Sequence, residues 1–414
     1  MTELEKMGAR AKAASRVLAS AGSRKDAALL AAADELEHDS GKILAANAED
    51  LAEAKAGGMS AALLDRLALS AQRVKSMADG LRSVAAQKDP VGEVVSGFTR
   101  PNGLHIEKVR VPFGVIGIIY EARPNVTADA AAVCLKAGSA VLLRGGKEAL
   151  HTNSAVEQAL RAAFEKAGLP ADCVQLVRDT THESSREMMM LTDYIDVLIP
   201  RGGKNLICSV TDNARVPVIK TGWGNCHIYV DASADVNMAA DIVFNAKTSR
   251  PSVCNAAESL LVHRDIAEAA LPAIKARLDE KNVELRGCER TRAILGESVV
   301  PATDEDYGTE YLDYIMSVKV VDSLDEAISH IAKYSSGHSE AIVTQNYGNA
   351  RRFTAEVDSA VVYVNASTRF TDGGEFGLGA EIGISTQKLH ARGPMGAGEL
   401  TTTKYIVTGN GQIR

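Results

Sequence analysis

Hydrophobic and polar positions change their period along the chain, and this change separates three kinds of segment. Over residues 1–90 the apolar positions recur at helical spacing among Ala, Leu, Glu, Asp and Lys, which predicts several helices. Residues 91–111 instead contain two β-branched runs around a Pro-Asn-Gly turn at 101–103, which predicts a hairpin. This hairpin either projects from the body and serves assembly or forms an edge of the main sheet.

From residue 113 onward, short apolar runs alternate with longer helical patterns. Strands are predicted at 115–119, 140–143, 173–177 and 197–199, with helices at 127–136, 148–167 and 183–191 between and around them. A second such stretch has strands at 228–230, 259–262, 317–321 and 360–365 and helices at 235–246 and 266–281, and 401–407 is a last strand. Strands separated by helices predict parallel βαβ units and hence doubly wound sheets.

Size and composition indicate a globular protein of two or three domains. The 414 residues are too many for one ordinary core, and 46% of them are hydrophobic against 24% charged. A net charge of −7 disfavours a broad nucleic-acid-binding face, although a local basic pocket for a phosphate ligand stays open. No run approaches the roughly 20 apolar residues of a membrane span, and the N-terminus lacks the apolar core of a signal peptide.

The cysteines and histidines indicate a reducing compartment and no metal. The six cysteines are widely spaced and form no C-x-x-C pair, which predicts thiols in a reducing cytosol. The nine histidines show no H-E-x-x-H spacing, and no G-x-S-x-G elbow of a serine hydrolase is present. We therefore expect a cytoplasmic protein that binds neither membrane nor nucleic acid.

Three loops that follow predicted strands have the composition of ligand-binding loops. Two of them, 144–147 and 200–204, place paired glycines beside Arg and Lys, and the third covers 120–125. In parallel sheets, ligands gather at the carboxyl ends of the strands, and paired glycines let the backbone approach a phosphate. Taken alone, each loop is better explained as an ordinary glycine-containing turn, because neither glycine pair matches G-x-G-x-x-G or a P-loop. Two such loops on successive βαβ units together favour an anion site.

Cys254 is the candidate nucleophile. Arg250 lies four residues before it, and this cation together with a helix N-terminus would favour thiolate over thiol. The alternative is a buried cysteine that acts as a small hydrophobic residue. The glycine-rich region 360–395 either shapes a pocket or forms a flexible surface loop.

Six ordered blocks together resemble the aldehyde dehydrogenase superfamily over essentially the whole chain. The blocks are residues 111–127, 143–149, 199–203, 220–227, 250–255 and 364–374. The resemblance implies an α/β fold with two doubly wound α/β domains and a β-hairpin oligomerisation arm. It places a cofactor-binding domain at 1–95 and 115–225, a catalytic domain at 226–385, and the arm at 96–114 and 386–414.

The resemblance also implies roles for individual residues. Cys254 becomes the nucleophile, and the side-chain amide of Asn125, with the backbone N–H of Cys254, forms the oxyanion hole. The implied cofactor is NADPH. Its implied contacts are Arg144, Gly145, Gly146 and Lys147 at the adenine ribose, Gly202 and Gly203 at the pyrophosphate, and Glu310 at the nicotinamide ribose.

One departure from the wider superfamily indicates reduction rather than oxidation. Ordinary aldehyde dehydrogenases use a glutamate before a Gly-Gly turn to hydrolyse the thioester, but residues 217–226 contain no Asp or Glu. The missing acid therefore supports reduction over oxidation. The substrate that the resemblance implies is L-glutamyl 5-phosphate and the product L-glutamate 5-semialdehyde, the second step of proline biosynthesis from glutamate. Residues expected to bind this substrate are Glu121, Arg250, Ser367, Thr368 and Arg369, with Arg250 placed to meet the leaving phosphate.

The partners implied are a small-molecule substrate, a hand-over of glutamyl phosphate from glutamate kinase, and other copies of the chain in a homo-oligomer. Two other functions remain open on the same scaffold. One is a phosphate-independent aldehyde dehydrogenase or acyl-CoA reductase, and the other is a protein that only binds. Dependence on phosphate would separate the first from an acyl-phosphate reductase, and an unreactive thiol at Cys254 would favour the second.

Overall fold

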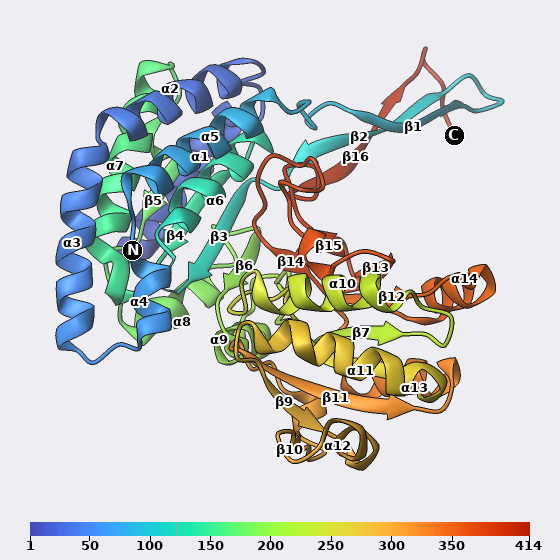
Figure 1. The fold of residues 1–414 in the computed structure, drawn as a ribbon. Helices are drawn as coiled ribbons and strands as arrows, with labels where there is room; N and C mark the ends of the chain where they lie inside the picture. The colour runs from blue at the N-terminus through green and yellow to red at the C-terminus, as the bar shows by residue number, and fades with distance from the viewer. Residues whose placement is uncertain (122) are drawn as a thin grey trace. The chain divides into compact units, whose positions relative to one another are not determined.

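The computed structural model describes residues 1–121 and 123–414, apart from the side chains of Ala61 and Ala62. These residues form two compact units (Figure 1). Unit 1 comprises Met1–Thr221, Gly377–Gly383 and Pro394–Arg414, and unit 2 comprises Gly222–Phe376 and Ile384–Gly393.

Unit 1 is built on a parallel four-stranded sheet in the order β5-β4-β3-β6. Its strands are β3 (Val115–Tyr120), β4 (Ala140–Arg144), β5 (Val174–Leu176) and β6 (Val197–Arg201). The connecting helices are α6 (Asn125–Lys136), η1 (Lys147–Ala149), α7 (Leu150–Lys166), η2 (Ala171–Cys173) and α8 (His182–Met190), and α9 (Lys204–Asn213) follows β6. All residues of β3 and β4 are buried, which explains their unbroken apolar runs. The loops that leave these strands therefore meet at one edge of the sheet.

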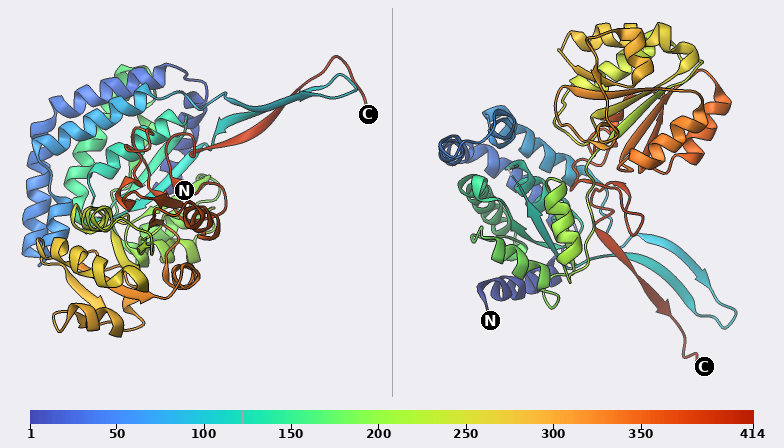
Figure 2. Two further views of the ribbon diagram at one scale, coloured as in Figure 1. Left: turned by 45° about the vertical axis from the view of Figure 1, so that its right-hand side comes forward. Right: turned by 90° about the horizontal axis from the view of Figure 1, so that it is seen from below.

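Five N-terminal helices complete the helical layers of unit 1 (Figure 2). They are α1 (Glu3–Leu18), α2 (Arg24–His38), α3 (Ser40–Ala56), α4 (Ala61–Leu67) and α5 (Ala71–Ala86). Helix α1 contacts β3, β4 and β5, whereas α2 packs on α5 and α7. Two fully buried lysines join these layers, because Lys25 Nζ lies 2.8 Å from Asp89 Oδ1 and Lys136 Nζ lies 2.6 Å from Asp26 Oδ1.

Unit 2 is built on a parallel seven-stranded sheet in the order β10-β9-β11-β8-β7-β12-β13. Its strands are β7 (Cys226–Val230), β8 (Ala257–His263), β9 (Glu284–Gly287), β10 (Val300–Pro301), β11 (Ile315–Val321), β12 (Ser339–Val343) and β13 (Val361–Val364). Its helices are α10 (Val236–Thr248), α11 (Arg264–Asp279), α12 (Glu289–Leu295), η3 (Asp306–Gly308), α13 (Leu324–Tyr334), α14 (Tyr347–Glu356) and η4 (Thr368–Phe370).

Alternate residues of the central strands of unit 2 enter two different hydrophobic cores. On β7, Ile228 and Val230 pack in the core formed with α10 and α11, whereas Tyr229 packs in the core formed with α13 and α14. Successive strand side chains point to opposite faces, so helices cover both faces of this sheet. The doubly wound α/β fold predicted from the sequence is confirmed in this unit.

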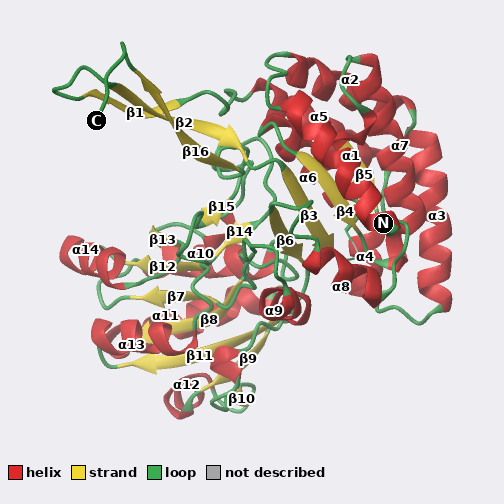
Figure 3. Ribbon diagram, turned by 180° about the vertical axis from the view of Figure 1, so that it is seen from behind, coloured by secondary structure: helices red, strands yellow, loops and turns green. Residues whose placement is uncertain are grey.

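The predicted hairpin forms a separate antiparallel sheet, not an edge of either parallel sheet. Its strands, in the order β1-β2-β16, are β1 (Val94–Thr99), β2 (His105–Pro112) and β16 (Thr401–Thr408). Figure 3 draws these strands extending beyond the helices of unit 1. Every residue of β1 is exposed, including the large apolar Phe98. A short two-stranded sheet of β14 (Ile384–Ser385) and β15 (Gly393–Pro394) lies in the glycine-rich C-terminal region.

The predicted strands and helices are all present, but several elements were not predicted from the sequence. These are α4 as a separate helix, α9, α12, α13, α14, β9, β10, β12, β14, β15 and the short helices η2, η3 and η4. Within the described ranges, the structure contains no helix with both the length and the apolar character of a membrane span.

Candidate active site

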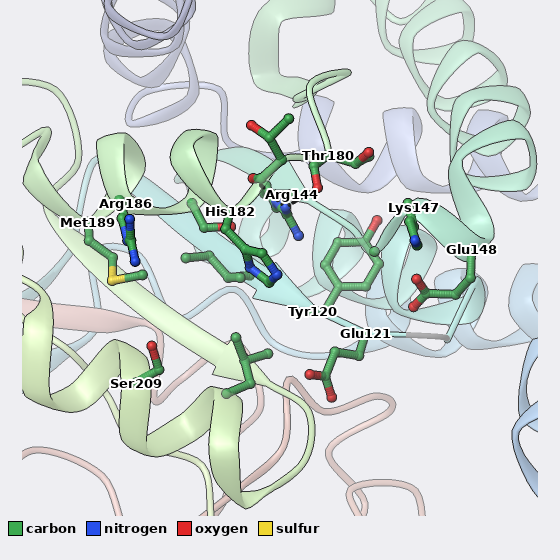
Figure 4. A pocket seen from close by; sticks show the side chains of 15 residues that line it. Tyr120, Glu121, Arg144, Lys147, Glu148, Thr180, His182, Arg186, Met189 and Ser209 are labelled. Carbon is green, nitrogen blue, oxygen red and sulfur yellow. Dashed lines mark hydrogen bonds between the residues drawn. The ribbon is translucent and has the colours of Figure 1, made fainter.

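A cavity of about 560 Å³ opens at the carboxyl edge of the unit 1 sheet (Figure 4). It is lined by the ends of β3 and β4, by the loop before α8, and by α8 and α9. The lining side chains include Glu121, Arg144, Lys147, Thr180, Thr181, His182 and Arg186. Two of the three glycine- and cation-containing loops named from the sequence therefore contribute to one cavity.

Arg144 links the end of β4 to the loop before α8. It is the last residue of β4, it is 8% exposed, and its Nη2 donates to the carbonyl oxygens of Thr180 at 2.6 Å and Thr181 at 2.7 Å. Burial lowers the pKa of the guanidinium. Its buried Nε has no hydrogen-bond partner among the described residues.

Neither of the two glycines after Arg144 could carry a side chain without displacing a neighbouring group. A Cβ on Gly145 would overlap the side-chain amide of Asn153, and a Cβ on Gly146 would overlap the carboxylate of Glu148. Lys147 follows with an exposed side chain on the rim of the cavity. Glycine backbone at the end of β4 and the exposed cations Lys147 and Arg186 line one cavity, which suits an anionic nucleotide, so these residues fit the implied cofactor.

Glu121 lies against the second glycine pair. Its Oε2 accepts the backbone N–H of Gly203 at 2.9 Å, and a Cβ on Gly202 would lie 2.5 Å from the same oxygen. Gly203 is the residue before α9, so the carboxylate occupies a helix N-terminus, where an anion is favoured. The structure therefore places Glu121 beside the expected pyrophosphate turn; its role in substrate binding stays a prediction.

Sequence reasoning did not identify the loop between β5 and α8 as part of the site. Thr180 and Thr181 end this loop, and His182 and Arg186 occupy the first two turns of α8. His182, Arg186 and Lys147 are all exposed at the cavity. Their position directly after a predicted strand was the signal that could have identified them.

Asn125 is the first residue of α6 in unit 1. Its side chain is exposed, and its Nδ2 donates to Asp129 Oδ2 at 2.8 Å, one helical turn later. The amide is therefore oriented by its own helix. The described coordinates place it in unit 1 and Cys254 in unit 2.

Cys254 lies in the turn between α10 and β8 of unit 2, and its side chain is partly exposed. The backbone of Gly224 packs directly against this turn. A Cβ on Gly224 would overlap the carbonyl oxygen and carbonyl carbon of Cys254, far inside van der Waals contact. Only glycine allows this approach, and the contact fixes the turn from the side of β7.

The next residue in the turn, Asn255, is held from the other side. The hydroxyl of Thr368 donates to the carbonyl oxygen of Asn255 at 2.7 Å, and Asn255 Nδ2 donates to the carbonyl oxygen of Thr371 at 2.9 Å. Arg369 Nη1 also donates to the side-chain oxygen of Asn255, and Arg369 Nε donates to the hydroxyl of Ser249 at 2.9 Å. Burial lowers the pKa of the Arg369 guanidinium.

The segment 367–369 therefore supports the nucleophile turn. Ser367 and Thr368 are buried, and the Ser367 hydroxyl accepts the backbone N–H of Arg369 at 3.3 Å. Arg250, in contrast, is exposed and adjoins the turn. Direct contact of Ser367, Thr368 and Arg369 with substrate stays a prediction, as does the role of Arg250.

Glu310 is linked to the Cys254 turn by a hydrogen bond with Gly224. Its Oε1 accepts the backbone N–H of Gly224 at 2.8 Å. The Glu310 loop is itself anchored, because Leu312, in a left-handed conformation with φ of 56°, donates its N–H to Glu258 Oε1 at 3.2 Å. Glu258 is fully buried and pairs with Lys247 Nζ at 2.6 Å, and burial raises the pKa of the Glu258 carboxyl to about 7.

All six cysteines are outside disulfides. In the part of the chain that the structure describes, no group of three or more His, Cys, Asp or Glu side chains is arranged to hold a metal ion.

Comparison with known proteins identifies the family. A model of the aldehyde dehydrogenase family matches residues 2–292. Gamma-glutamyl phosphate reductase of Moorella thermoacetica is 60% identical over 413 residues, covering 100% of this chain and 99% of that protein. The chain belongs to the aldehyde dehydrogenase family, among its gamma-glutamyl phosphate reductases. As a member of this family it is a nicotinamide-dependent oxidoreductase.

Solved structures agree with this membership. The crystal structure of gamma-glutamyl phosphate reductase from Thermotoga maritima is 50% identical and covers 100% of both chains, with a TM-score of 0.96. An acetylating aldehyde dehydrogenase from Geobacillus thermoglucosidasius is 17% identical, with a TM-score of 0.72 over 100% of this chain and 97% of that one. The second likeness shows the shared aldehyde dehydrogenase fold alone, and the fold class predicted from the sequence is confirmed.

The contact between Gly224 and the Cys254 turn predicts that Gly224→Ala disables this reductase without unfolding it. The added Cβ must displace the carbonyl of Cys254, and a displacement of about 1 Å at a reacting group costs about 100-fold in rate. Steady-state kcat and the far-ultraviolet circular dichroism spectrum measure the two effects. Gly41→Ala is the control, because a Cβ there meets nothing within 4 Å. Full activity in Gly224→Ala would contradict the packing described.

Proposed function

We propose that the chain reduces L-glutamyl 5-phosphate to L-glutamate 5-semialdehyde and phosphate with NADPH, the second step of proline biosynthesis from glutamate. The observation that carries this proposal is full-length identity of about 60% to enzymes named gamma-glutamyl phosphate reductase. The rigidly held Cys254 turn and the nucleotide-sized cavity of unit 1 supply the two parts that such a reaction needs.

Cys254 attacks the acyl carbon, and the phosphate leaves as the acyl group is transferred to sulfur. The oxyanion of the tetrahedral intermediate is stabilised by the backbone N–H of Cys254 and by the amide of Asn125, which Asp129 orients. The nicotinamide cofactor, when bound, supplies the hydride that reduces the thioester. Collapse of the resulting hemithioacetal regenerates the Cys254 thiolate and releases the aldehyde.

The residues around Cys254 protect the thioester from water. Segment 217–226 carries no Asp or Glu that could activate a hydrolytic water. Glu310, whose carboxylate does lie near this segment, accepts the N–H of Gly224. This arrangement favours the acyl-phosphate reductase over an aldehyde-oxidising dehydrogenase, whose reaction ends in hydrolysis.

Arg250 is assigned to the phosphate of the substrate, because it is the exposed cation next to the nucleophile turn. Burial lowers the pKa of the Arg369 guanidinium, and the positive charge of Arg250 lowers it further. The amino-acid end of the substrate is assigned to Glu121, Arg369, Ser367 and Thr368. Ser367 and Thr368 act there through the backbone they hold.

The exposed three-stranded arm is assigned to assembly of a homo-oligomer. Strands β1 and β16 are its two edges, and both carry large exposed apolar side chains, among them Phe98, Tyr405 and Val407. Unpaired strand edges of this kind invite pairing with a second copy. We further propose that the enzyme works in the cytoplasm and receives glutamyl phosphate from glutamate kinase.

The function is tested by oxidising glutamate semialdehyde with NADP⁺, with and without inorganic phosphate. We expect turnover to require phosphate, and Cys254→Ala to lower kcat more than about 1,000-fold, because no other group can form the thioester. Cys288→Ala, at a half-buried cysteine of α12's N-terminus, is the control and keeps full activity. Turnover indifferent to phosphate would mean a phosphate-independent aldehyde dehydrogenase.

Preference for NADPH is assigned to Lys147, His182 and Arg186 on the rim of the cavity, since Arg144 is held by the two threonine carbonyls. Titration calorimetry with 2′,5′-ADP and with 5′-AMP isolates the 2′-phosphate. We expect Arg186→Ala to weaken the binding of 2′,5′-ADP about 10-fold, which corresponds to the loss of one hydrogen bond to a charged group. The affinity for 5′-AMP should stay unchanged. Lys166→Ala, in an exposed pair with Glu35, should change neither. Equal weakening of both ligands would contradict the assignment.

A further inference from the structure

We propose that Cys226 is a positioning residue for the nucleophile: its thiol donates a hydrogen bond to the carbonyl oxygen of Cys254 and so fixes the backbone from which the reactive sulfur projects. The inference rests on the proposed function in one respect, that Cys254 is the nucleophile. Cys226 itself touches neither substrate nor cofactor in this account.

The geometry of the contact assigns the hydrogen bond. Cys226 is the first residue of β7 and is fully buried, and its Sγ lies 3.2 Å from the carbonyl oxygen of Cys254. A second possible acceptor near this sulfur is His338 Nδ1, at 3.7 Å. That nitrogen already lies 2.8 Å from the hydroxyl of Ser339. The single thiol proton therefore goes to the nearer acceptor, the carbonyl of Cys254.

Burial also favours the protonated form of the Cys226 thiol. Burial raises the pKa of the Cys226 thiol well above its ordinary value, and the nearby Glu340 carboxylate acts in the same direction. A thiol that stays protonated is a constant donor and a poor nucleophile. Two cysteines in contact thus have separate roles, one reactive and one supporting.

The pairing of β7 with β8 is irregular beside Cys226, and this irregularity aligns Cys226 with the Cys254 turn. Cys226 pairs with Ala257, but the next residue, His227, pairs with Ser259, so Glu258 is an extra residue on β8. A bulge of this kind is rare between parallel strands and re-aims the chain beside it. The bulge lies just after the Cys254 turn, where Cys226, the first residue of β7, contacts the carbonyl of Cys254.

Gly224 and Cys226 act on the same carbonyl group in complementary ways. Gly224 leaves room for the carbonyl beside the start of β7, and the Cys226 thiol holds its oxygen there by a hydrogen bond. Together they restrict rotation about the Cα–C bond of Cys254. The backbone N–H and the sulfur of Cys254 are then held in a fixed relation, which oxyanion stabilisation requires to within about 0.5 Å.

Loss of the thiol donor should therefore slow chemistry and leave binding unchanged. Cys226→Ala removes the donor, and Cys226→Ser retains one. We expect Cys226→Ala to lower kcat about 10-fold, with KM values for semialdehyde, phosphate and NADP⁺ within about 2-fold. Cys226→Ser should restore kcat to within about 3-fold of the original enzyme, since a hydroxyl is a stronger donor than a thiol.

A second readout does not depend on substrate or cofactor. Iodoacetamide alkylation of Cys254, followed by mass spectrometry of its peptide, should be slower in Cys226→Ala and recover in Cys226→Ser. Cys173→Ala, which removes a buried thiol of unit 1, is the matched control and should change neither kcat nor alkylation.

The proposal is overturned if Cys226→Ala matches the original enzyme in both kcat and alkylation, or if folded Cys226→Ser is as impaired as Cys226→Ala. Should Cys226→Ala fail to fold, Cys226→Thr and Cys226→Val give a pair of equal shape that differs in the hydroxyl. Equal kcat in these two variants would also overturn it. Failure of the proposed function is distinct: the original enzyme would then show no dependence on phosphate, whatever the Cys226 variants do.

Discussion

The Cys254 turn depends on the close approach of its backbone to that of Gly224. Because the carbonyl of Cys254 occupies the space of a side chain at position 224, the strand entering the sheet and the turn carrying the nucleophile cannot move independently. Thr368 completes the arrangement by holding the carbonyl of Asn255 at 2.7 Å. Residues from three distant parts of the sequence thus make a rigid turn from a short connection between α10 and β8.

The chemical groups are divided between the two units. Unit 2 holds Cys254 and the residues that fix it, whereas unit 1 holds Asn125 and the cavity edged by Lys147 and Arg186. Each unit orients its own groups before they act, through the Asn125–Asp129 hydrogen bond in one and the Gly224–Cys254 packing in the other. Such preorganisation reduces the reorganisation required during the reaction.

Much of the fold could be predicted from the sequence because its strands are apolar and fully buried. Residues 115–120 and 140–144 read as strands directly, and their parallel pairing followed from the helices between them. Strand β12 (Ser339–Val343) was missed because it carries buried polar residues. Its Glu340, fully buried, accepts the backbone N–H of His227 at 2.6 Å, a partner 113 positions away that no local pattern reveals.

The candidate site could also be predicted in part from the sequence. The glycine loops at 144–147 and 200–204 were located by composition, whereas Cys254 and Asn125 were selected by resemblance to a family. The contacts of Arg144 with Thr180 and of Glu121 with Gly203 join residues 36 and 82 positions apart, and they decide what these side chains can bind. Spacing within a motif contains no information about such contacts.

The most direct test of the central claim is intact-protein and peptide mass spectrometry of enzyme mixed with glutamyl phosphate but no nicotinamide cofactor. The account predicts one glutamyl group attached to the peptide that contains Cys254, persisting because no acidic residue of segment 217–226 activates water, and absent in Cys254→Ala. Attachment at another residue, or none at all while the enzyme remains active, would contradict reduction through a Cys254 thioester.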